Sequence, residues 1–155
     1  MNELYRVKSL ICKTLKGDLE SFEMLKTMEV TDKDAYQLRK IFVALIELVY
    51  RNRNRKKDYI SYSELASHAN KIYPHFKLPE QGGSLAKVVG SILGELSFLS
   101  YCCCDFLISA VVTKKGKNKQ GKGFFELVRS LEENENKIKN WIGKTKEIAE
   151  RVCGR

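Results

Sequence analysis

Apolar residues recur at helical spacing through the first third of the chain. The first series predicts a helix that ends near Gly17, and Asp18 stands where it can cap a second, shorter helix. Thr31-Asp-Lys-Asp34 has the order of a capping box and opens a third, long helix. The apolar positions of the three helices are Leu4, Val7, Leu10, Ile11, Leu15, Leu19, Phe22, Leu25, Met28, Leu38, Ile41, Phe42, Leu45 and Val49. This pattern predicts a helical N-terminal part, residues 1–57, whose role is packing.

The middle of the chain alternates short helical patterns with breaks. Ser61-Tyr-Ser-Glu64 forms another capping box and starts a short helix that continues to Asn70. The segment 74–83 holds both prolines and two adjacent glycines, which predicts a loop. Ser84 can cap the next helix, in which Gly90 and Gly94 are spaced to let another backbone approach one face closely. The apolar residues of that helix are Leu85, Val88, Val89, Ile92, Leu93 and Leu96.

An apolar run over 106–113 predicts a strand, which a lysine- and glycine-rich loop ends. Ordered structure resumes at Gly121-Lys-Gly-Phe-Phe125. The order helix, loop, helix, strand, basic loop is typical of a winged helix-turn-helix, in which the second helix enters a DNA groove and the loop forms the wing. We therefore predict a mainly helical α+β fold whose core, residues 58–125, is a winged helix with a small β wing.

The C-terminal arm, residues 126–155, is highly charged but carries a weak apolar seam. Its members are Val128, Leu131, Ile138, Ile142, Ala149 and Val152. Steps of three and four residues predict a helix. The seam can pack on the chain's own N-terminal helices, or it can form a homodimer. We expect the three parts to form one compact unit.

Composition and charge narrow the class of protein. With 155 residues, 43% of them hydrophobic and 30% charged, the chain can bury a core without disulfides. Of its 28 basic residues, five lie in the segment 51–57 and five in the segment 114–122, and neither segment contains an acid. Such runs attract a phosphate backbone, although solvated surface loops have the same composition. The formal net charge of +9 therefore favours a polyanionic partner.

The apolar runs do not predict a membrane partner or secretion. The longest, FVALIELVY and FLISAVV, are well short of the roughly 18–20 residues that a membrane span needs. The N-terminal segment has no sustained apolar stretch followed by a small-residue cleavage site. We expect a cytoplasmic protein.

The sequence does not predict an enzyme, a cofactor or a metal. Cys102, Cys103 and Cys104 are consecutive, whereas structural zinc is typically bound by cysteine pairs separated by two to four residues. His68 and His75 could complete such a site only if the fold brought them close. No phosphate-binding loop, dinucleotide fingerprint or nucleophile elbow is present. We expect the cysteines to be reduced and buried.

Four short segments give the middle of the chain a resemblance to a known family. They are Tyr62-Ser-Glu-Leu-Ala66, Val89-Gly-Ser-Ile-Leu93, Leu107-Ile-Ser-Ala-Val-Val112 and Gly121-Lys-Gly-Phe-Phe125. Residues 59–125 resemble the winged helix of the alkyltransferase-like DNA-binding domains. In DNA alkyltransferases a Pro-Cys-His-Arg segment precedes paired valines, whereas here Leu107 to Ala110 precede Val111-Val112 and Ile108 takes the place of the acceptor cysteine. The resemblance therefore implies DNA binding, with 84–96 as the reading helix and 114–122 as the wing, and no alkyl transfer.

These observations predict a non-catalytic protein that binds nucleic acid, most simply double-stranded DNA. Basic residues would hold phosphates, while polar residues at the start of the reading helix would contact bases. The predicted contacts are Arg51, Arg53, Arg55, Lys56, Lys57, Gln81, Ser84, Lys87, Ser91, Lys114, Lys115, Lys117, Lys119 and Lys122. The alternative is a protein-interaction module, such as a phage or mobile-element inhibitor or adaptor, that docks on an acidic partner surface.

Overall fold

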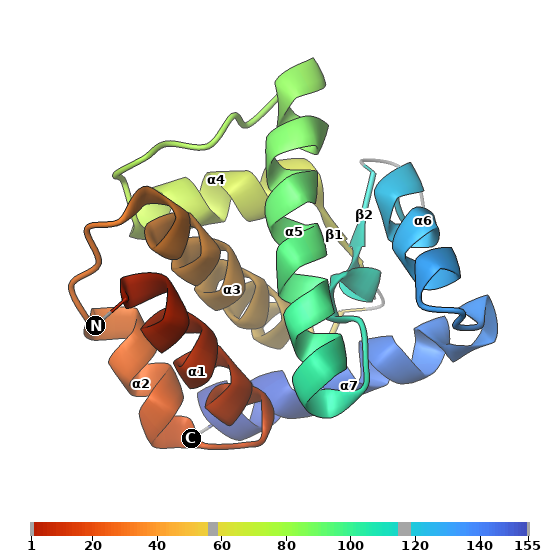
Figure 1. The fold of residues 1–155 in the computed structure, drawn as a ribbon, viewed down its shortest axis with the longest axis horizontal. Coiled ribbons are helices and arrows are strands. Elements are labelled where there is room, and N and C mark those ends of the chain that lie inside the picture. The colour runs from red at the N-terminus through yellow and green to blue at the C-terminus, as the bar shows by residue number, and fades with distance from the viewer. Residues whose placement is uncertain (1, 56–58, 115–118, 155) are drawn as a thin grey trace.

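The computed structural model describes residues 2–55, 59–114 and 119–154. Within these ranges the protein is mainly helical with one small sheet, which confirms the predicted α+β class (Figure 1). The helices are α1 Glu3–Leu15, α2 Leu19–Thr27, α3 Lys33–Arg51, α4 Tyr62–Ile72, α5 Gly83–Cys104, α6 Lys122–Ser130 and α7 Ile138–Cys153. The strands are β1 Ile60–Ser61 and β2 Val112–Thr113, and the 3-10 helices are η1 Ile108–Val111 and η2 Glu135–Lys137.

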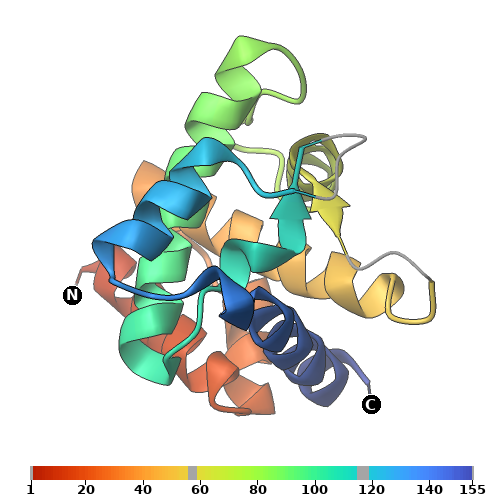
Figure 2. The same cartoon turned by 90° about the vertical axis from the view of Figure 1, so that its right-hand side faces the viewer.

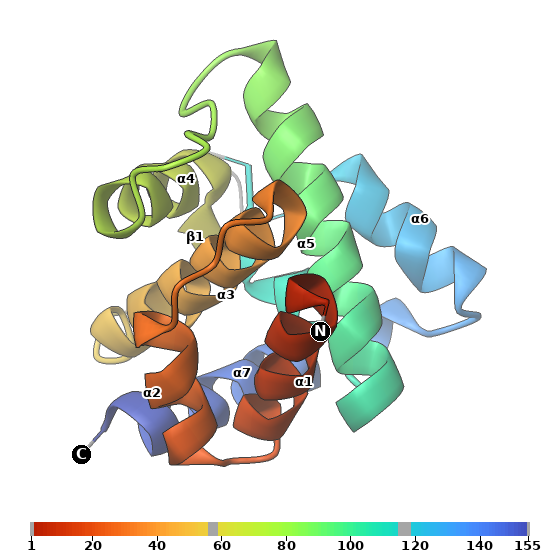
Figure 3. The same ribbon diagram turned by 60° about the vertical axis from the view of Figure 1, so that its left-hand side comes forward.

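Helix α3 is the central element of the core. It contacts α1, α2, α4, α5 and α7, and most of its side chains are buried (Figure 3). Its cap is Asp32, whose carboxylate accepts from the Ala35 N–H at 3.0 Å, so the predicted capping box at Thr31 is wrong by one residue. The Thr31 N–H donates instead to Glu3 of α1 at 3.0 Å. This contact joins the starts of α1 and α3.

Two other predicted caps are confirmed. The Asp18 carboxylate accepts from the Glu20 N–H at the start of α2. At the start of α4, Ser61 and Glu64 form both bonds of a reciprocal capping box. Since Ser61 is also the last residue of β1, the chain turns directly from the sheet into α4.

Helix α5 begins earlier and ends later than predicted. Gly82 is its N-cap, with a φ of 83°, so Ser84 is inside the helix and does not cap it. The helix continues past the predicted end at Leu96 as far as Cys104, and Leu96, Ser97 and Ser100 are buried there. Its N-terminal turns rise above the neighbouring elements (Figure 1). Among the described residues α5 alone is long and apolar enough to cross a membrane, a property that core helices of soluble proteins share.

The predicted strand over 106–113 is wrong for most of its length. Only Val112 and Thr113 form a strand, and they pair in parallel with Ile60 and Ser61. Residues 108–111 form the 3-10 helix η1, which is buried between α5 and α7. The pairing is limited because β1 ends where α4 begins, which leaves β2 two residues to pair with.

The C-terminal arm consists of two helices at an angle. Its chain turns at Glu132, with a φ of 56°, between α6 and α7 (Figure 2). The seam residues Ile142, Ala149 and Val152 are buried, and α7 contacts α1, α2 and α3. The arm therefore packs on the chain's own N-terminal helices, which was the first of the two predicted arrangements. The homodimer stays a prediction.

Candidate functional site

A groove of about 470 Å3 lies between α5 and α6. The two helices are neighbours in the views of Figures 1 and 3. The groove is lined by Tyr62, Ala86, Lys87, Gly90, Ser91, Leu93, Gly94, Ser109, Lys114, Gly121, Lys122, Gly123, Phe124 and Leu127. We call it the α5–α6 groove. It joins side chains from α4, α5, η1, the segment after β2, and α6.

Two glycines of α5 keep the α5–α6 groove open. A Cβ atom built on Gly90 or Gly94 would have no atom within 4 Å among the described residues outside its own helical turn. Glycine inside a helix is less favourable than alanine by about 1 kcal/mol. No contact within the described part of the chain requires glycine at either position. The sequence correctly placed both on one face, but the backbone predicted to approach them is not one of the chain's own described segments.

Gly121 is fixed by a different constraint. A Cβ atom on it would lie 2.7 Å from Oη of Tyr62, which packs against the start of α6. Burial raises the pKa of Tyr62, so its hydroxyl stays protonated at neutral pH. Gly121 is also the N-cap of α6 and supplies no side-chain cap. The first N–H groups of α6 therefore lie beside the groove with the positive end of the helix dipole.

Three lysines from three different segments reach the α5–α6 groove. They are Lys87 of α5, Lys114 after β2, and Lys122 in the first turn of α6. Within the ranges that the structure describes, Lys87 and Lys114 have no side-chain hydrogen-bond or ion-pair partner, and Lys122 is 3.9 Å from Glu126. None of the described residues that line the groove is acidic. Lys87 and Lys114 thus bring to the groove positive charge that no described side chain pairs, and Lys122 adds a third charge with Glu126 beside it.

The hydroxyl groups beside the lysines differ in availability. Ser91 is exposed on α5. Ser109 is buried, its N–H donates to Oγ of Ser97 at 2.9 Å, and its own hydroxyl accepts from Ser97. Ser91 is therefore the serine of the groove that is free to contact a ligand.

The structure brings together four of the predicted contact residues: Lys87, Ser91, Lys114 and Lys122. Lys119 is exposed, with its Nζ 5.6 Å from the centre of the Phe125 ring. Gln81 and Ser84 are exposed at the projecting end of α5. The remaining predicted lysines, Lys56, Lys57, Lys115 and Lys117, lie outside the described residues.

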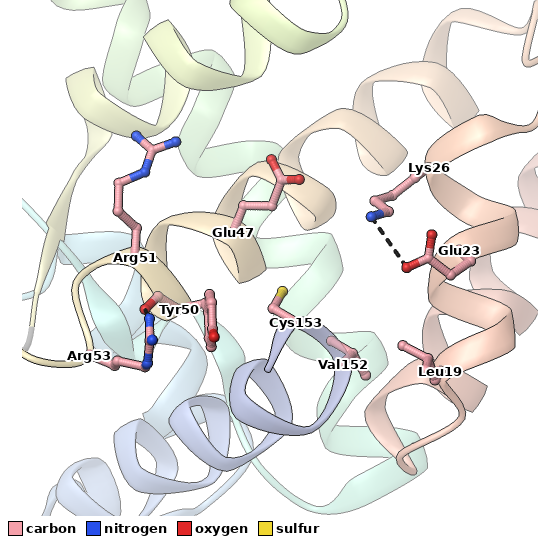
Figure 4. Close-up of a pocket in the computed structure, with 9 residues that line it drawn as sticks. All are labelled: Leu19, Glu23, Lys26, Glu47, Tyr50, Arg51, Arg53, Val152 and Cys153. Carbon is pink, nitrogen blue, oxygen red and sulfur yellow. Dashed lines mark hydrogen bonds and ion pairs between the residues drawn. The ribbon is translucent and has the colours of Figure 1, made fainter. Parts of the chain in front are cut away.

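Arg51 and Arg53 of the first basic run lie elsewhere, at a mixed-charge pocket of about 790 Å3 (Figure 4). Arg51 and Arg53 line it together with Glu23 and Glu47. Arg53 pairs with Glu150 of α7 at 3.1 Å and stacks on the Tyr50 ring at 3.7 Å. The run is free of acids in sequence, but folding brings carboxylates to it.

The described residues Arg55 and Lys114, one from each basic run, flank different ends of the two strands. Arg55 precedes β1, whereas Lys114 follows β2, and the two strands are parallel. Parallel strands begin at the same end of a sheet, so the start of one strand and the end of its neighbour lie at opposite ends of the sheet. Arg55 is exposed.

The prediction that the cysteines are buried is wrong, because Cys102 is exposed and the other four are only partly buried. Within the described ranges, no group of three His, Cys, Asp or Glu side chains is arranged to hold a metal ion. The Cys103 and Cys104 sulfur atoms are 3.3 Å apart, and burial together with bonding to Cys12 raises the pKa of Cys103. His68 contacts Glu47 at 2.9 Å.

Sequence reasoning missed part of the α5–α6 groove. Tyr62 and Ser109 were assigned to a capping box and to a strand, and only the fold brings them to the site. Gly121 and Gly123 flank Lys122, but Gly121 is buried against Tyr62, a contact that no local pattern in the sequence indicates. Comparisons of the chain with protein families, curated proteins and solved structures gave no match.

Proposed function

We propose that this protein binds nucleic acid, most simply duplex DNA, without catalysing a reaction, and that the α5–α6 groove is the main contact. The observation that carries the proposal is the convergence of Lys87, Lys114 and Lys122 on a groove without described acidic residues. Lysines that contact phosphates neutralise them and release counterions, which is the largest sequence-independent term in such binding.

The projecting end of α5 complements this contact. Gln81 and Ser84 are exposed there and can reach base edges while the groove holds the backbone. We propose a winged-helix mode of binding, in which α5 is the reading helix and the segment after β2 is the wing. The bond from the Lys114 N–H to the Lys119 carbonyl, at 3.4 Å, places these two predicted contact residues beside each other, which supports the proposal.

The test is fluorescence anisotropy with a labelled DNA duplex at several salt concentrations. The variant replaces Lys87, Lys114 and Lys122 with alanine. The control replaces Lys16, Lys71 and Lys139, three exposed lysines that do not line the groove, so that both proteins lose the same charge.

We expect the groove variant to bind at least tenfold more weakly. The magnitude of its slope of log K against log salt should fall by roughly three, about 0.9 for each phosphate contact. The control should keep a slope close to that of the wild type. Equal losses in both variants would mean that net charge alone attracts DNA. No binding of the wild type at low salt would favour the protein-interaction module, to be sought with an acidic partner.

A further inference from the structure

Packing among the described residues does not explain the open face of α5. Ala86, Gly90 and Gly94 are four residues apart and all line the α5–α6 groove. Val89 and Leu93 of the same turns are buried and hold α5 in place, and Leu93 also borders the groove. The glycines therefore weaken the helix without improving a described internal contact.

We infer that one sugar-phosphate backbone of the bound nucleic acid lies against the α5 backbone between Gly90 and Gly94. Its phosphates then face Lys87, Lys114 and Lys122, while Ser91 and Tyr62 can donate to phosphate oxygens. This inference rests on the proposed function and names the part of the ligand that enters the groove.

The chemistry of the groove favours a phosphate backbone over an acidic protein segment. Three lysines from separate segments line a groove whose floor has no side chain at Gly90 and Gly94, and a phosphodiester strand presents one negative charge at every nucleotide. The side chains of an acidic helix would keep its backbone away from Gly90 and Gly94. A sugar-phosphate backbone could instead contact the α5 backbone directly at these two positions. Contact of this kind uses no base edge, so the groove binds strands of any sequence.

The experiment adds side chains to the floor one size at a time. Gly90 and Gly94 are each replaced by alanine and then by leucine, both good helix formers. Gly143 of α7 provides the matched control, since it is an exposed helical glycine whose Cβ would also meet nothing within 4 Å. Thermal unfolding is measured with each binding isotherm.

We expect every alanine variant, including Gly143→Ala, to raise Tm by roughly 2–4 °C. The Kd for duplex DNA should rise about tenfold for Gly90→Ala and Gly94→Ala and further for the leucine variants. It should not change for the Gly143 variants. The salt slope should be retained, because the lysines are still present. A variant that is more stable but binds DNA more weakly is still folded, so its weaker binding means that the added side chain keeps DNA from the floor of the groove.

Three results would overturn the inference. The first is unchanged DNA affinity in the Gly90 and Gly94 variants while the lysine variant still loses affinity. The proposed function would then stand, but the DNA backbone would not contact the α5 backbone at these glycines. Competition by poly-glutamate that the glycine variants abolish would assign the floor to an acidic polypeptide. Absence of DNA binding by the wild type would remove the inference together with the proposed function.

Discussion

Lys40 lies where α3, α4 and the connection to α5 meet. Its Nζ donates to Oδ1 of Asn70 at 2.9 Å and to the His75 carbonyl at 3.2 Å. Asn70 in turn donates to the carbonyl of Leu78 and accepts from the Leu78 N–H. The Lys40 side chain is fully buried, and desolvation lowers the pKa of Lys40 to about 8 despite the attraction of Glu80. Lys40 therefore fixes the segment that leads to α5.

Because Lys40 is buried, we expect the unfolding free energy of the protein to change with pH in the alkaline range. Between pH 8 and 10.5 the native state binds fewer protons at this site than the unfolded state does, so stability rises with pH. The difference between the pKa of 10.5 in the unfolded state and about 8 in the folded state corresponds to about 3 kcal/mol, at 1.36 kcal/mol for each pKa unit. We expect the difference in unfolding free energy between wild type and Lys40→Met to move in favour of the wild type by up to that amount. Urea unfolding across this pH range measures it.

The matched control for Lys40 is Lys71→Met, at an exposed position of α4. Its difference from the wild type should not vary over the same pH range. A pH-independent difference for Lys40→Met would contradict the prediction, because it would mean that Lys40 titrates alike in the folded and unfolded protein.

Single residues were predictable from sequence where their partners are local. Asp18 and Ser61 cap helices through N–H groups two and three residues away, and both predictions are confirmed. Thr31 was assigned wrongly because its N–H bonds to Glu3, which is 28 residues distant. Arg39 shows the same limit, since its guanidinium is buried and donates to the carbonyls of Leu25 and Met28.

Serines of α5 determine how the next element folds. Ser100 accepts from the Ile108 N–H at 3.1 Å and donates to the Phe106 carbonyl at 2.7 Å. Ser97 accepts from the Ser109 N–H and donates to the Ser109 hydroxyl. These side chains satisfy backbone groups that a strand would have paired with a neighbour. Hydrophobicity alone indicated a buried segment over 106–113, but it could not distinguish η1 from a strand.

Removal of one of these hydroxyls should destabilise the whole protein. Ser97→Ala leaves the buried Ser109 N–H without its acceptor, which costs about 1–3 kcal/mol. We expect that loss in urea unfolding, and a change within about 0.5 kcal/mol for the control Ser91→Ala, because Ser91 is exposed on the same helix. Equal stability of the two variants would show that η1 is held by packing and not by the serines.

At the scale of the whole molecule, folding separates charges that look equivalent in sequence. The two basic runs account for the excess of positive charge, and the formal net charge is +9. The part of the candidate site on α5 and near α6 could be predicted, since Lys87, Lys114 and Lys122 do converge. The part at Arg51 and Arg53 could not be placed, because the acids beside it come from α2, α3 and α7.

Arg53 and the lysines of the α5–α6 groove should therefore respond differently to mutation. Arg53 pairs with Glu150, stacks on Tyr50 and donates to the Tyr50 carbonyl at 2.7 Å. We expect Arg53→Ala to lower the unfolding free energy by about 1–2 kcal/mol and to leave the salt slope of DNA binding nearly unchanged. Lys114→Ala should instead keep the stability and reduce the slope by about one.

Glu150→Gln is the informative partner to Arg53→Ala. It removes the carboxylate from the ion pair but keeps the size of the side chain, so it frees the Arg53 guanidinium for another anion. If the pair is mainly structural, this variant loses part of the same stability and gains no DNA affinity. If Arg53→Ala instead lowers the salt slope by about one and Glu150→Gln tightens binding, then Arg53 exchanges a carboxylate for a phosphate. The DNA would then extend from the α5–α6 groove to the mixed-charge pocket that Arg53 lines.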